Sequence, residues 1–153
     1  MNGPNAMMAP FVRLRALAET RVVEGAVLLL TRLTLAGVFW RAGRSKVVEG
    51  SWLTISDSTW YLFQEEYAGM PIPAWIGAPM ATYVEHLLPI LLVLGLATRL
   101  SALALFGMTM MIQIFVYPEA WWQTHALWVV MALALVTRGG GVLSVDRLIF
   151  RHR

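Results

Sequence analysis

The chain has 153 residues, of which 58% are hydrophobic and 14% charged, and its mean hydropathy is +0.63. Soluble domains contain about 45–50% apolar and about 25% charged residues, so this composition excludes a soluble globular protein and indicates an integral membrane protein. The formal net charge of +3 does not point to nucleic acid, because no basic stretch alternates with aromatic residues. There are no cysteines, which excludes thiol chemistry, thiolate metal sites and iron–sulfur ligation by this chain.

Four stretches are long and apolar enough to cross a bilayer, which takes about 20 residues of helix. They cover residues 22–44, 80–97, 100–117 and 121–137. The last three are joined by very short connections, so consecutive helices must run antiparallel. The sequence therefore predicts an all-α integral membrane protein with four transmembrane helices in an up-down bundle. The bundle covers residues 22–138, between an N-terminal segment, 1–21, and a C-terminal tail, 139–153.

The connection between the first two helices is the longest and carries a helix of its own. Residues suited to an N-cap precede Trp60, Phe63 and Tyr67, which follow one another at intervals of three and four residues. This pattern predicts an interfacial amphipathic helix, which is either an anchor in the membrane surface or a lid over the outer end of the bundle. Three prolines, the last of them Pro79, then predict an extended or turning segment before the second transmembrane helix.

Positive charges are distributed unevenly between the two sides of the predicted membrane domain. Eight arginines fall on the side of the termini, and three cations, Arg41, Arg44 and Lys46, fall on the opposite side. Because cytoplasmic segments carry the excess of Lys and Arg, both termini are predicted to lie in the cytoplasm. Most tryptophans lie on the opposite, outer side, as expected of an aromatic belt.

Polar residues of all four predicted helices are expected in one layer beneath the outer interface. The layer contains Arg44, Lys46, Glu85, Gln113 and His125, each within the outer turns of its helix. It is either a ligand-binding pocket or a structural network in which Glu85 neutralises a cation of the first helix. These residues are candidates for ligand binding, and the sequence identifies no catalytic residue.

His86 and His125 are the histidines that haem between the helices would use as ligands. His86 follows Glu85 directly, so the two side chains point about 100° apart, and His86 should face elsewhere if Glu85 faces the core. His125 is then the single inward imidazole, whereas haem held between helices would need a suitable pair of axial ligands. This argues against haem. The methionines between residues 108 and 111 have the spacing of apolar filler, so no metal site is predicted.

Arg32 is a further ligand-binding candidate, because it lies in the middle of the first apolar stretch. It is about 18 Å from the outer end of that helix, at a depth where a charge costs about 2.5–3.5 kcal/mol. No acidic residue of the other predicted helices lies at its depth. Three alternatives follow: the side chain reaches toward the cytoplasm, it binds hydroxyls and backbone carbonyls with Thr109 among them, or it binds a ligand.

The order and spacing of several motifs resemble the DoxX family. In the first helix the pattern consists of Arg32, Gly37, Phe39, Gly43 and Lys46. Residues 85–103, EHLLPILLVLGLATRLSAL, resemble the family's second-helix glutamate and its GL-x-TR turn. Residues 137–149, TRGGGVLSVDRLI, resemble its closing segment. The stretch IQIFVYPEAW is similar to the DoxX subgroup found beside metal-responsive modified-peptide systems.

This resemblance implies a multi-pass protein of the bacterial inner membrane that belongs to a redox or metal- and oxidative-stress system. As a subunit of an oxidoreductase it would pass electrons, with quinone as the expected cofactor, to or from a partner protein at the outer face. The alternative is a non-catalytic component that assembles or tethers a stress-response complex. Besides the lipid bilayer and this partner, the sequence is compatible with a homo-oligomer.

Overall fold

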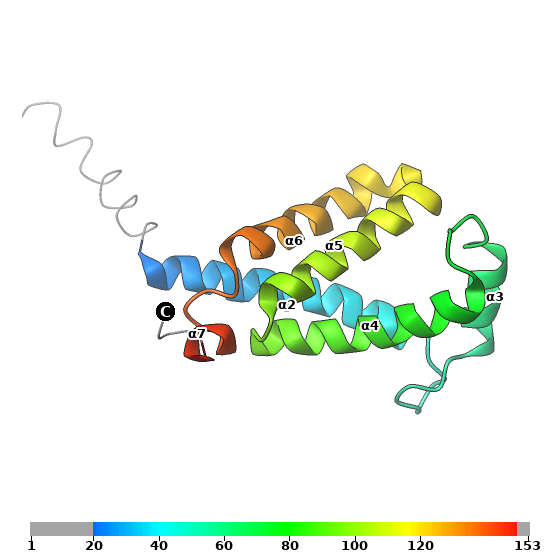
Figure 1. Ribbon diagram of the computed structural model, residues 1–153, viewed down its shortest axis with the longest axis horizontal. Helices are drawn as coiled ribbons and strands as arrows, with labels where there is room; N and C mark the ends of the chain where they lie inside the picture. The colour runs from blue at the N-terminus through cyan, green and yellow to red at the C-terminus, as the bar shows by residue number, and fades with distance from the viewer. Residues whose placement is uncertain (1–19, 150–153) are drawn as a thin grey trace, which may run out of the picture.

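The computed structural model describes residues 20–149 and consists of four long antiparallel helices (Figure 1). They are α2 (Arg21–Arg44), α4 (Ala74–Leu94), α5 (Thr98–Phe115) and a fourth segment, Pro118–Arg138. The fourth segment contains a 3-10 turn, η1 (Pro118–Ala120), a π-helical turn, η2 (Trp121–His125), and α6 (Ala126–Arg138). All four are long and apolar enough to cross a membrane, which confirms the predicted all-α membrane fold.

Each helix packs against two others, so the bundle closes on itself. In Figure 1, α2 lies beside α4, and α5 lies beside α6. The centre of the bundle holds one fully buried leucine from each long helix: Leu35, Leu92, Leu105 and Leu135. Small residues bring the backbones close, since Ala36, Ala102 and Ala132 are almost fully buried. The outward faces carry exposed Leu, Ile and Val side chains, as expected of helices surrounded by lipid.

The second transmembrane helix begins earlier than the sequence pattern predicts. It starts at Ala74 instead of residue 80, because Pro79 lies inside the helix and does not end it. A proline removes one backbone donor, and a membrane helix tolerates this where neighbouring groups can compensate. The helix ends at Gly95, whose φ of 70° is in the left-handed region, and the amide of Leu96 closes the turn on the carbonyl of Leu91.

The predicted amphipathic helix is present as α3 (Asp57–Glu65), at the outer end of the bundle (Figure 1). Its N-cap is Ser56, whose hydroxyl accepts a hydrogen bond from the amide of Thr59. Phe63 is buried against Ala78 and Ala81 of α4, so this helix rests on the protein rather than only on the membrane surface. Of the two alternatives, this packing favours a lid.

The ends of the chain are described in part. The predicted N-terminal segment, residues 1–21, lies mainly outside the described residues. At the other terminus, α7 (Val145–Ile149) follows a glycine-rich turn. The turn and α7 lie beside the connection between α4 and α5 (Figure 1), where the amide of Asp146 donates to the carbonyl of Gly95. This part of the predicted tail is therefore packed against the bundle.

Candidate ligand-binding site

Lys46 and Glu85 form a buried ion pair at the outer end of the bundle. The Lys46 Nζ lies 2.7 Å from Glu85 Oε2, and the two side chains are 10% and 3% exposed. Lys46 follows the C-cap of α2, and its ammonium also donates to the carbonyl of Ala42 at 3.2 Å. The expectation that Glu85 neutralises a cation of the first helix is therefore confirmed, with Lys46 as that cation.

This ion pair lines a cavity of about 260 Å³, which we call the outer cavity. It is enclosed by α3, the segment between α3 and α4, α4 and α5. Apart from Lys46, Glu85 and the Tyr67 side chain, its walls are mainly apolar, including Phe63, Met80, Ala81, Ala104, Met108 and Met111. A small apolar cavity with a few polar groups on one side is the usual form of a small-molecule site.

The outer cavity reaches the lipid-facing surface of the bundle. Met80 of α4 and Ala104 of α5 line it and are also exposed on the outside. Within the described residues, side chains of α4 and α5 thus connect the cavity to the outside of the bundle.

Arg44 precedes Lys46 by two residues, but its side chain hydrogen-bonds to the backbone of the loop that follows α2. Its guanidinium donates to the carbonyls of Ser51 and Trp52, at 2.9 and 3.0 Å. These bonds stabilise the loop that leads to α3, together with the hydrogen bond from the Thr59 hydroxyl to the Lys46 carbonyl. Arg44 therefore positions the loop above the cavity and is not among the residues that line it.

Gln113 and His125 form a second polar pair, apart from the outer cavity. The His125 Nδ1 lies 2.7 Å from Gln113 Oε1, and the amide nitrogen of Gln113 donates to the carbonyl of Pro118 at 2.7 Å. The π-helical turn η2 brings the buried imidazole of His125 to this place, and its ring packs on Trp128. This pair connects α5 to the start of the fourth segment, so the expected single layer consists of two separate pairs.

His86 is buried, contrary to the expectation that His125 is the single inward imidazole. It is 5% exposed, its Nδ1 lies 2.7 Å from the carbonyl of Thr82, and its ring packs edge-on against Trp40. A Cβ on Gly43 would lie 2.9 Å from this ring, so the glycine provides its space. The expectation failed because α4 packs against both α2 and α5, so two faces 100° apart can both be buried.

Arg32 is fully buried and is separate from the outer cavity. Its Nη1 donates to the carbonyl of Leu92 at 3.3 Å, and its Nη2 donates to the carbonyl of Leu143 at 2.6 Å. These backbone carbonyls were among the expected partners, but Thr109 is not, because its hydroxyl donates to Leu105. Figure 1 shows that α2 extends past the inner end of α4. Because its partner Leu92 is in the last turn of α4, Arg32 lies level with the inner end of that helix.

The C-terminal tail brings the carboxylate of Asp146 to the inner end of the bundle, near Arg32. Asp146 interacts electrostatically with Arg32, and its two oxygens accept hydrogen bonds from the amides of Ala97 and Thr98 at 2.7 and 2.8 Å. Asp146 therefore caps the N-terminus of α5 from a distant part of the chain. Together with Arg32, Leu92 and Leu143 it forms what we call the inner cap.

We expect loss of the Asp146 carboxylate to weaken the inner cap. Asp146→Ala leaves the first amides of α5 without acceptors, which costs about 0.5–2 kcal/mol for a helix cap. Asp146→Asn keeps one acceptor and should lose less. The unfolding midpoint of each purified variant in detergent measures the effect, and a midpoint for Asp146→Ala equal to that of the wild type would show that the cap contributes nothing.

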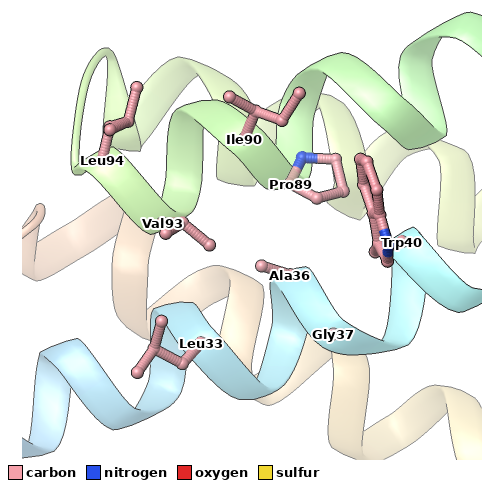
Figure 2. A pocket seen from close by; sticks show the side chains of 8 residues that line it. All are labelled: Leu33, Ala36, Gly37, Trp40, Pro89, Ile90, Val93 and Leu94. Atoms are coloured by element: carbon pink, nitrogen blue, oxygen red, sulfur yellow. The ribbon is translucent and has the colours of Figure 1, made fainter.

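A second cavity lies between α2 and α4 (Figure 2). It is a groove of about 400 Å³, which we call the α2–α4 groove, lined by Leu33, Ala36, Gly37, Trp40, Pro89, Ile90, Val93 and Leu94. Figure 2 shows only apolar side chains and the Trp40 ring along it. Its lining contains no charged side chain. The groove therefore suits a lipid acyl chain better than a ligand that needs polar or catalytic groups.

The sequence does not predict three residues of these sites: two that line the outer cavity and one that belongs to the inner cap. Tyr67 and Phe63 were assigned to a helix face but not to a cavity wall, because nothing local indicates how far the lid covers α4. Asp146 was assigned to the tail, although an aspartate after a glycine-rich turn is a suitable cap for another helix. Among residues 20–149 there is no cluster of three or more His, Asp or Glu that could bind a metal ion.

Comparisons with known proteins agree with this architecture. The DoxX family model matches residues 27–118, which include most of α2 and all of α3, α4 and α5. An uncharacterized protein of Haemophilus influenzae is 33% identical over 142 residues, covering 82% of this chain and 85% of that protein. No solved structure matches the chain. The chain belongs to the DoxX family of membrane proteins.

Proposed function

We propose that this DoxX protein is a membrane subunit of a redox system and binds a quinone-class molecule in the outer cavity. The observation that carries the proposal is the Lys46–Glu85 ion pair on the wall of an otherwise mainly apolar cavity. Lys46 supplies a donor for a quinone carbonyl, and Glu85 supplies an acceptor for the hydroxyl of the reduced form. The methionine and phenylalanine side chains around them fit an apolar ring.

The surroundings of the outer cavity suit a ligand that is dissolved in the bilayer. Ala104 and Met80 connect it to the lipid-facing surface, so a ligand with a long apolar tail can enter sideways and leave its tail in the membrane. The residues of the site bind and hold the ligand but carry no electrons themselves. Electrons would therefore pass to or from a partner protein, which we place at the outer face, beside the lid.

Analysis of the lipids that co-purify with the protein tests this function. Ala104→Trp fills the mouth of the cavity, and Leu103→Trp is its matched control, because Leu103 is the preceding exposed residue of α5 and does not line the cavity. We expect quinone in the organic extract of the wild type and of Leu103→Trp, and much less in Ala104→Trp. Equal amounts in both variants would contradict binding in the outer cavity, and no quinone in the wild type would favour the non-catalytic assembly role.

We further propose that the protein resides in the bacterial inner membrane with both termini in the cytoplasm. Arg21, Arg99, Arg138 and Arg147 lie at the end of the bundle that holds the inner cap, and the arginines at both termini of the sequence add to them. Reporter fusions after residue 153 should be active in the cytoplasm, whereas reporters inserted within residues 50–54 should be active outside it. The same sidedness at both places would contradict this orientation.

A further inference from the structure

Tyr67 connects the outer cavity to the protein surface. It lies between α3 and α4 and lines the cavity, and its ring packs against Phe63 with the centroids 4.8 Å apart. Its hydroxyl interacts electrostatically with Glu85. On the other side its ring meets Tyr117 edge-on, with the centroids 6.0 Å apart. Tyr67 therefore lies between the cavity and the outer end of α5.

The polar groups beyond Tyr67 continue toward the solvent. The edge contact of the two rings brings the hydroxyls of Tyr67 and Tyr117 close enough to interact electrostatically. The hydroxyl of Tyr117 in turn donates to Glu66 Oε2 at 2.9 Å. Glu66 is exposed, so its carboxylate can exchange protons with water. The Tyr117 hydroxyl therefore donates toward the surface, on the side of Tyr67 that lies away from the cavity.

We propose that Tyr67, Tyr117 and Glu66 form a proton relay between the outer cavity and the outer aqueous phase. The relay rests on the proposed function, and it specifies a ligand whose redox change is coupled to proton transfer. When a hydroquinone loses two electrons to the partner protein, each O–H bond of the ligand breaks. The proton passes by way of the Glu85 carboxylate, which accepts the ligand hydroxyl, to the oxygen of Tyr67; the Tyr67 proton passes to Tyr117, and the Tyr117 proton passes to Glu66.

Each hydroxyl gives up its own proton as it receives another, so no charged tyrosine needs to form. Burial of Tyr67 raises the pKa of its hydroxyl above the ordinary value, which disfavours a free tyrosinate. Burial, and next the hydrogen bond to Glu66, raise the pKa of Tyr117 as well. After one transfer the two hydroxyls rotate back, and the second proton follows the same route.

Voltammetry of the full-length protein in a lipid film, loaded with decylubiquinone, tests the relay. The electrode supplies and removes the electrons, so no partner protein is needed. In Tyr117→Phe and Glu66→Gln, both away from the cavity wall, the ligand signal should remain. The rate of its proton-coupled step should fall on the order of 10²-fold, which is typical of a lost proton-transfer group. The control is Tyr61→Phe, an exposed tyrosine of α3 that should behave as the wild type.

The outcomes separate the relay from the proposed function. A ligand signal with unchanged rates in Tyr117→Phe and Glu66→Gln would overturn the relay and leave quinone binding intact. Absence of a ligand signal from the wild type would overturn quinone binding and the relay with it. Tyr67→Phe keeps the ring contacts with Phe63 and Tyr117 and loses only the hydroxyl, so the same slow step in this variant would identify Tyr67 as the first member.

Discussion

Glu85→Gln is expected to destabilise the protein more than most single substitutions, because it leaves the Lys46 ammonium buried without its counter-charge. Removing one partner of a buried ion pair costs about 3–5 kcal/mol, which is more than the pair itself contributes. Replacing both residues, with Lys46→Met added to Glu85→Gln, removes the uncompensated charge. The double variant should therefore recover much of the lost stability, measured as the unfolding midpoint in detergent.

An exposed ion pair of the same chain provides the control. Arg138 Nη1 and Glu24 Oε1 lie 3.1 Å apart, with side chains that are 69% and 47% exposed. Such pairs contribute about 0–1 kcal/mol, so Glu24→Gln should change the midpoint little. If the Glu85→Gln and Lys46→Met effects simply add, the two residues do not interact, and the polar wall assigned to the outer cavity would be incorrect.

The second large effect is expected at Arg32. Arg32→Leu removes the donors that pair with the carbonyls of Leu92 and Leu143. Each buried carbonyl left unpaired lowers the free energy of unfolding by about 1–3 kcal/mol. It also releases the tail that Arg32 holds against α4. Arg32→Lys should be intermediate, since one ammonium lacks the planar fork that spans both carbonyls. Limited proteolysis should then cut within residues 139–149 faster than in the wild type.

The control for this prediction is Arg41→Leu, which removes an exposed arginine from the outer part of the same helix. A surface substitution of this kind changes stability by about 0.5 kcal/mol or less. If Arg32→Leu is instead more stable than the wild type and its tail is equally protected, Arg32 is a tolerated charge. If Arg32→Leu is as stable as the wild type but no longer retains quinone, Arg32 binds the ligand and its role is not confined to the inner cap.

The sequence predicts the parts of this fold that depend on local pattern. Apolar length identifies the four spans, and the position of Glu85 near the outer end of its helix is sufficient to predict a cation from the first helix as its partner. It does not distinguish Arg44 from Lys46. That choice depends on the turn after α2, where the backbone directs Lys46 inward and Arg44 toward the carbonyls of Ser51 and Trp52.

Long-range contacts could not be predicted in the same way. The inner cap joins Arg32 to residues more than a hundred positions away, and nothing near Arg32 shows that the tail returns to it. The length of the first apolar stretch gives the depth of Arg32 correctly only if the helices end at equal levels, and α2 extends past the inner end of α4. The lid presents a similar difficulty, because the contact between Tyr67 and the cavity depends on how α3 packs on α4.

Photoaffinity labelling with an azido-quinone tests the location of the ligand most directly. The full-length protein in lipid vesicles is irradiated with the probe, with and without excess decylubiquinone, and labelled peptides are identified by mass spectrometry. Binding in the outer cavity predicts labels within residues 63–72 and 108–112 that the competitor prevents. Competed labels confined to the α2–α4 groove, within residues 33–40 and 89–94, would contradict a quinone site at the Lys46–Glu85 pair.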